Sequence, residues 1–151
     1  MAKSEDKLRD GATEFLEAGE RILAAAVVAA RGHTQAVAGV RGVGLAQQRA
    51  AMAAGERAEL VVHSPMGLAI TDRRLLSLEI SNGLGMGIGL KVKGLMSAVP
   101  LDAVDGIEVK RLISGKKLVV TMNGEEIAME AGAGANVSGI ADAFESARAT
   151  A

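Results

Sequence analysis

The sequence contains no cysteine, and only two of its 151 residues are proline and two aromatic. The lack of cysteine excludes a disulfide framework, a thiolate nucleophile and a zinc–thiolate site, and it suits a reducing cytoplasm. The two rings, Phe15 and Phe144, leave the core to aliphatic and methionine side chains. They also exclude stacking of bases on aromatic platforms, so nucleic acid is not an expected partner.

Long apolar runs are absent as well. The longest extends from Ile22 to Ala30, far short of the roughly 20 residues that a membrane-spanning helix needs. The first 20 residues carry six acidic side chains, whereas a secretory signal begins with a basic and then an apolar stretch. We therefore expect no transmembrane span and a cytoplasmic protein, with membrane association left open.

The charge is distributed unevenly along what its length indicates is a single domain. The net charge is only −1, but residues 73–117 hold eight basic and four acidic side chains, and residues 118–151 hold one and five. The basic block would suit an anionic lipid surface. The alternative is that these side chains merely solvate the outer faces of strands. The basic residues of this block are Arg73, Arg74, Lys91, Lys93, Lys110, Arg111, Lys116 and Lys117.

The apolar pattern predicts a mostly β protein with a helix at each end. Ser4 is a candidate N-cap for the first helix and Gly19 its end. Asn123-Gly124 and Ser114-Gly115 accept the positive φ angles of tight hairpin turns. Strands are predicted at 20–30, 66–71, 74–80, 91–100, 106–112, 117–122 and 126–131.

The last predicted helix carries Val137, Ile140, Phe144 and Ala147 on one face, with Asn136 or Ser138 as its N-cap. An antiparallel roll needs its open end filled, and Phe144 is the natural plug. Residues 31–64 are rich in glycine and alanine and show no clean period. We interpret them as an insertion between the first two strands, with a short helix over residues 43–54.

Several short motifs resemble those of bacterial pleckstrin-homology-like proteins, close to the GRAM-like group and most similar to those of actinobacteria. The motifs are Leu-Glu-x-Gly-Glu at 16–20, Thr-Asp-Arg-Arg-Leu at 71–75 and Pro-Leu-Asp at 100–102, followed by the closing helix. The resemblance implies a seven-stranded antiparallel roll capped by a C-terminal α-helix. Residues 1–19 would form an N-terminal helix, and residues 20–150 the domain with its insertion at 31–64. The closing helix lacks tryptophan and the first loop lacks a lysine/arginine-rich motif, which argues against specific phosphoinositide recognition.

No set of residues predicts catalysis. His33 and His63 have no carboxylate or cysteine at ligand spacing, so no metal site is expected. The glycines near Lys116 and those at 83–89 do not fit a P-loop or a dinucleotide fingerprint. We therefore expect a protein that is not an enzyme and that has no catalytic residue and no cofactor.

The segment Gly83–Leu90 alternates glycine with large apolar residues, so one face is apolar and the other is bare backbone. It would enter a bilayer interface or a partner groove, aided by Lys91 and Lys93, would serve self-association, or would rest on the domain's own barrel. The sequence predicts a binding or scaffolding module that self-associates, binds an anionic membrane or protein partner, or does both. A structural homo-oligomer or filament without a lipid ligand is the alternative. The residues predicted for self-association are Leu84, Met86, Ile88 and Leu90.

Overall fold

The computed structural model describes residues 3–31, 41–63, 65–81, 90–113, 115–132 and 134–149. The helices are α1 (Lys3–Ala12), α3 (Arg41–Arg57) and α4 (Val137–Ala149), with short 3-10 helices at Thr13–Phe15 and Leu101–Ala103. The strands are β1 (Ile22–Ala30), β2 (Met66–Thr71), β3 (Arg74–Ser81), β4 (Lys91–Pro100), β5 (Val104–Leu112), β6 (Gly115–Met122) and β7 (Glu125–Ala131).

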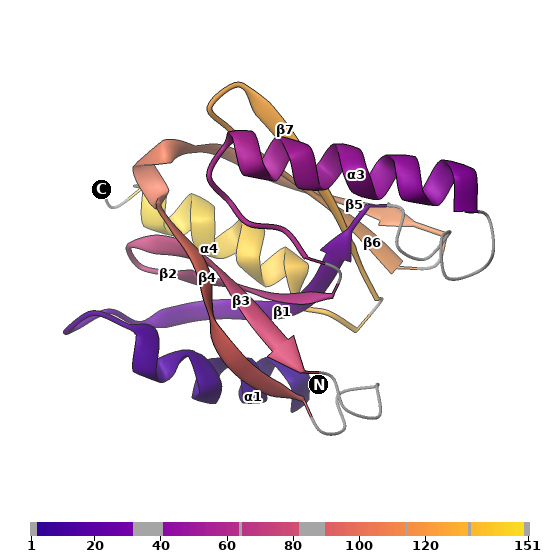
Figure 1. Cartoon of the computed structure of the whole chain (residues 1–151). Coiled ribbons are helices and arrows are strands. Elements are labelled where there is room, and N and C mark those ends of the chain that lie inside the picture. The colour runs from indigo at the N-terminus through magenta and orange to yellow at the C-terminus, as the bar shows by residue number, and fades with distance from the viewer. Residues whose placement is uncertain are drawn as a thin grey trace.

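The strands form one antiparallel sheet in the order β4-β3-β2-β1-β7-β6-β5. This confirms the predicted fold class, a mostly β protein of seven antiparallel strands with a helix at each end. The predicted bounds of β2 and β4 are reproduced. β1 is the central strand, since it pairs with β2 on one side and with β7 on the other. The edge strands of the sheet are β4 and β5, and the sheet curls around α4 (Figure 1).

Helix α4 fills the interior of the roll. Phe144 is fully buried there among aliphatic side chains of both halves of the sheet, as the sequence predicts. Asn136 is the N-cap, because its Oδ1 accepts the backbone N–H of Gly139 at 3.1 Å. The helix therefore begins at Val137 and directs its apolar stripe at the core.

A second core lies on the other face of strands β1–β4, under α1. Leu8 and Ala12 pack there on Ala25, Ala69 and Leu76. Because α1 covers one face of β2 and α4 the other, every residue of β2 is buried. The helix begins at Lys3 and ends at Ala12, so the predictions of Ser4 as N-cap and Gly19 as helix end are wrong.

Gly11 allows α1 to approach the sheet closely, because a Cβ at this position would lie 2.6 Å from Cγ2 of Val92. The turn between β6 and β7 also agrees with the sequence: Asn123 and Gly124 have φ angles of 51° and 75°. Those two positive values form the two-residue turn predicted there. Of the other predicted turn, Ser114 lies outside the described residues and Gly115 has a φ of 118°.

The segment expected to be an insertion contributes a helix of 17 residues to the main core. The helix predicted over residues 43–54 is shorter than the observed one. This part of the chain also belongs to the packed body of the domain. Ala51, Ala54 and Ala58 of this segment are buried against the sheet, and Arg57 Nη2 lies 2.8 Å from Glu125 Oε1 on β7. The helix therefore forms an outer layer over β7 (Figure 1).

The chain turns back under α3 at its C-terminus. The N–H of Leu60 donates to the carbonyl of Gly55 at 2.9 Å and that of Glu59 to the carbonyl of Glu56 at 3.2 Å. This pair of bonds is a Schellman motif, with Glu59 in the left-handed position at φ 68°. A Cβ on Gly55 would lie 2.5 Å from the Leu60 carbonyl oxygen, so glycine is what allows this close approach.

Candidate functional site: a basic hairpin and an apolar groove

The strongest concentration of positive charge lies on the β5–β6 hairpin. In its register Lys110 is opposite Lys117 and Arg111 is opposite Lys116. Like charges directly opposite each other across two strands destabilise a sheet. The five ion pairs found among the described residues use other basic side chains. We call Lys110, Arg111, Lys116 and Lys117, with Ile113 between the two strands, the basic hairpin.

One face of the basic hairpin is next to the N-terminus of α4. Arg111 and Lys116 line a hollow of about 220 Å³ together with Val109 and Ser138. Ser138 lies in the first turn of α4, where the unpaired N–H groups of a helix carry partial positive charge. Two cationic side chains and the start of α4 therefore meet at this hollow. On the other face Lys117 lies between Lys110 and Glu130 of β7.

The tip of the basic hairpin is apolar. Ile113 has a relative exposure of 108%, so its side chain projects fully into solvent. Nothing in the sequence analysis singled out this residue. The signal was a large aliphatic side chain inside a turn between Leu112 and Gly115, where polar residues are usual. The tip thus places one exposed aliphatic side chain between two cationic strands.

The other basic residues of the predicted patch are not part of this hairpin. Lys91 and Lys93 are exposed at the start of β4, the opposite edge strand of the sheet order. Arg73 lies in the β2–β3 turn with Nη1 3.7 Å from Glu17 Oε1. The structure thus divides the predicted set over three places and brings four of its eight members together.

Arg74 requires a correction. Its guanidinium is mostly buried and forms an ion pair with Glu20, with 2.6 Å between Nη2 and Oε1. The same nitrogen donates to the carbonyl of Phe15 at 3.0 Å. The charge of Arg74 is therefore neutralised within the fold, and it does not belong to an anion-binding surface. The Thr-Asp-Arg-Arg-Leu phrase marks a structural turn.

The predicted self-association segment lies mostly outside the described residues, including Leu84, Met86 and Ile88. Leu90 is described, and it is buried in the core under α1 with an exposure of 4%. Its assignment to self-association is therefore wrong, because the chain's own helix covers it.

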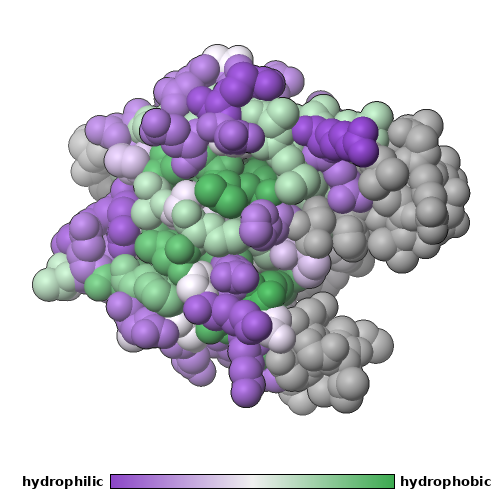
Figure 2. Space-filling view, viewed as in Figure 1, coloured by the Kyte–Doolittle hydropathy of each residue, from purple (hydrophilic) through white to green (hydrophobic). Residues whose placement is uncertain are grey.

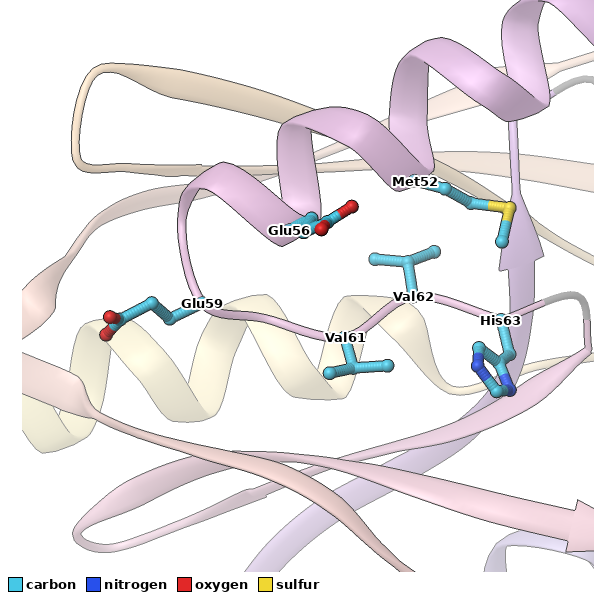
Figure 3. A pocket seen from close by; sticks show the side chains of 6 residues that line it. All are labelled: Met52, Glu56, Glu59, Val61, Val62 and His63. Atoms are coloured by element: carbon cyan, nitrogen blue, oxygen red, sulfur yellow. The ribbon is translucent and has the colours of Figure 1, made fainter.

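A groove lies beneath α3, and we call it the α3 groove. It has a volume of about 380 Å³ and is lined by Met52, Glu56, Glu59, Val61, Val62 and His63. In Figure 3 Met52 and Glu56 come from the helix, while Val62 points up to the helix and Val61 points away from it. A second hollow of about 480 Å³ adjoins the first, since both are lined by Met52 and His63; it extends toward Glu79 and Ile80. Figure 2 shows apolar surface in the middle of this face, bordered by hydrophilic residues.

The floor of the α3 groove is the segment that follows the Schellman motif. Leu60 and Val62 of this segment are buried in the main core. Between them, the N–H of Val61 donates to Ser97 Oγ of β4 at 3.0 Å, and Ser97 Oγ is hydrogen-bonded to Ser77. These anchors leave the Val61 side chain half exposed in a fixed position. The absence of a clean period in residues 31–64 explains why the sequence analysis missed this site.

Among the described residues no group of three or more His, Cys, Asp or Glu side chains is close enough to hold a metal ion. His63 lines the α3 groove, and His33 lies outside the described residues. No helix in the described part of the chain is long and apolar enough to cross a bilayer.

No family model and no curated protein matches this chain. Among solved structures, it is similar to a DUF1696 family protein with a pleckstrin-homology domain from Shewanella loihica PV-4. The two are 14% identical, the match covers 93% of this chain and 90% of the other, and the TM-score is 0.47.

Proposed function

We propose that this protein is a non-catalytic binding module that docks on anionic membrane surfaces through its basic hairpin. The observation that carries the proposal is the exposed Ile113 at the tip of a hairpin with two facing pairs of like charges. Such pairs are unfavourable in the isolated fold. An anionic surface relieves their repulsion, and the apolar tip gains free energy by entering the interface.

The expected strength of this contact is modest. Each basic side chain near an anionic leaflet contributes about 1 kcal/mol, so the four cations of the basic hairpin together give reversible recruitment. Burial of one isoleucine adds about 1.5–3 kcal/mol. Binding should weaken with salt, because charges are screened within about 8 Å at physiological ionic strength.

Nucleic acid is a poorer candidate for the same charges. Stacking needs exposed rings, but Phe144 is buried and Phe15 is partly buried against the α1 core. An inorganic or organic phosphate in the hollow beside α4 would use only Arg111 and Lys116 and would leave the exposed Ile113 unexplained. A membrane surface uses both features of the hairpin.

Co-sedimentation with vesicles of phosphatidylcholine, with and without phosphatidylserine, tests the proposal. The wild-type protein should bind the anionic vesicles at low salt and not the neutral ones. Lys110→Gln with Lys117→Gln should weaken partitioning by about thirtyfold, from about 2 kcal/mol. Ile113→Ser should weaken it without changing the salt dependence.

The matched control is Lys91→Gln with Lys93→Gln, which removes the same charge from the opposite edge strand. It should bind nearly as the wild type does. Equal binding to neutral and anionic vesicles contradicts the proposal, as does equal loss in the control and hairpin variants.

A further inference from the structure

The exposed apolar residues fall into two complementary places. Three large apolar residues of the described part are exposed to solvent, Met52 and Val61 in part, at 39% and 36%, and Ile113 fully, at 108%. Met52 and Val61 line the α3 groove, and Ile113 is the tip of the basic hairpin. One place is a hollow and the other a projection.

The charges around these two places are opposite. Glu56 and Glu59 line the α3 groove, and Glu79 lines its extension; all three are exposed. Cationic side chains surround Ile113 on both strands of the basic hairpin. The tip of the hairpin therefore complements the groove in charge, and both have an apolar centre. It does not occupy the groove of its own chain, because Ile113 is fully exposed.

The backbone at Glu59 adds an independent observation. This residue is in the left-handed region at φ 68°, where glycine is the usual choice at the C-terminus of a helix. A non-glycine residue in this conformation costs of order 1 kcal/mol or more. The fold therefore places an acidic side chain at the groove despite the conformational cost of its backbone. Residues in strained backbone conformations are frequent at binding sites.

We infer that the basic hairpin of one copy inserts Ile113 into the α3 groove of a second copy. The isoleucine covers Met52 and Val61, and Lys116 and Arg111 approach Glu56 and Glu59. The contact is heterologous: it leaves one groove and one hairpin unused, so it extends into a ring or a filament. A single hairpin in a groove buries less area than a standard interface, so assembly depends on concentration.

This inference adds the α3 groove, which the proposed membrane function does not use. Both contacts need the hairpin, so a membrane and a second copy compete for it. Anionic vesicles should therefore reduce the mass of the assembly in solution. Variants of the groove separate the two functions, because they change assembly alone.

Light scattering of the purified protein over a range of micromolar concentrations tests the inference. The wild-type mass should rise above 15.4 kDa as concentration increases and should fall with added salt. The variants Val61→Asp in the groove and Ile113→Asp at the tip should each remain monomeric. Val61→Asp should still bind anionic vesicles, whereas Ile113→Asp should lose both activities.

The decisive measurement is a mixture of the two variants. Val61→Asp keeps a working hairpin and Ile113→Asp keeps a working groove, so together they should form a 1:1 complex of about twice 15.4 kDa that grows no further. Thr13→Asp is the matched control, since it makes the same change in net charge on the exposed 3-10 helix after α1. It should assemble as the wild type does. Far-ultraviolet circular dichroism and thermal unfolding identify any variant that does not fold, and Met52→Ser then replaces Val61→Asp.

Three results overturn the inference: a wild-type protein that stays a protomer at high micromolar concentration, assembly that survives both aspartate variants, or a mixture that forms no complex. None of these depends on vesicle binding. Conversely, loss of the proposed membrane function leaves the light-scattering results as they are.

Discussion

Arg74 holds the carboxylate of Glu20 with two of its guanidinium nitrogens, Nε at 2.9 Å from Oε2 and Nη2 at 2.6 Å from Oε1. Thr71 Oγ1 donates to the same carboxylate at 2.6 Å, and the N–H of Glu17 donates to it at 2.8 Å. The hydrogen bond from Arg74 is the largest cause that lowers the pKa of Glu20 to about 2, from an ordinary value of 4.5. The β2–β3 turn is thereby joined to the chain that leads into β1.

This ion pair predicts a loss of stability in acid. The pKa of Glu20 is lower in the folded protein than in the unfolded chain, so the stabilisation is complete above about pH 4.5 and declines as the pH falls toward 2. It amounts to about 3 kcal/mol. Glu20→Gln should be less stable than the wild type at pH 7, and the difference should narrow by about 2 kcal/mol at pH 3. Urea unfolding of both proteins at the two pH values measures this difference in the free energy of unfolding. Glu126→Gln, which changes an exposed carboxyl on β7 in the same way, is the control.

Phe144→Ala tests the plug of the roll. The ring is fully buried between the two halves of the sheet, so its removal leaves a cavity and should cost about 3–5 kcal/mol. Denaturant unfolding gives the value. A loss below about 1 kcal/mol would mean that α4 is not the cap of the core.

Arg111→Glu should stabilise the fold while weakening its binding to anionic vesicles. The new carboxylate lies opposite Lys116 and beside the N-terminus of α4, and both are favourable for a negative charge. We expect a gain of about 0.5–1 kcal/mol in the free energy of unfolding. Thermal unfolding and vesicle co-sedimentation on the same preparation check both effects. A variant that is less stable than the wild type would show that the facing cations are not in conflict.

Glu59→Gly should also raise stability, by about 1 kcal/mol, because glycine adopts the left-handed conformation without a Cβ clash. The same substitution removes an acidic side chain from the α3 groove and should weaken self-assembly. The two measurements are urea unfolding and light scattering. Glu59→Ala keeps the backbone strain and separates the effect of the charge, since it should weaken assembly without the gain in stability.

Some of the elements could be predicted from the sequence because a residue with a clear local role bounds them. Asn123-Gly124 forms the β6–β7 turn and Asn136 caps α4, as expected. Helix α3 could be predicted only in part. Its buried face is made of alanines such as Ala51 and Ala54, and such small side chains give little hydrophobic contrast along the sequence. Its position is fixed by tertiary contacts, namely the burial of these alanines in the main core and the ion pair between Arg57 and Glu125 of β7.

The candidate site was predictable in charge but not in arrangement. The sequence identified the basic block, yet Arg74 carries the same charge as Arg111 and differs only in having Glu20 opposite it after folding. Leu90 and Ile113 likewise differ in what covers them after folding. Both are aliphatic residues close to glycine in the sequence, but α1 covers the first while nothing in the described part of the chain covers the second.

The short ladder between β1 and β7 has a consequence for the order of folding. It pairs Ala29 with Glu130 and Ala30 with Met129, and an ion pair of 3.2 Å joins Arg31 to Glu130, 99 residues later in the chain. Strands β1–β4 form a meander of neighbours, which can assemble while the ribosome is still adding the remainder. The β1–β7 seam closes only when β7 has been made, after the entropy of a long loop has been lost. Until then the alanine-rich end of β1 is an open edge, and a nascent chain is most exposed to wrong pairing with another chain at this place.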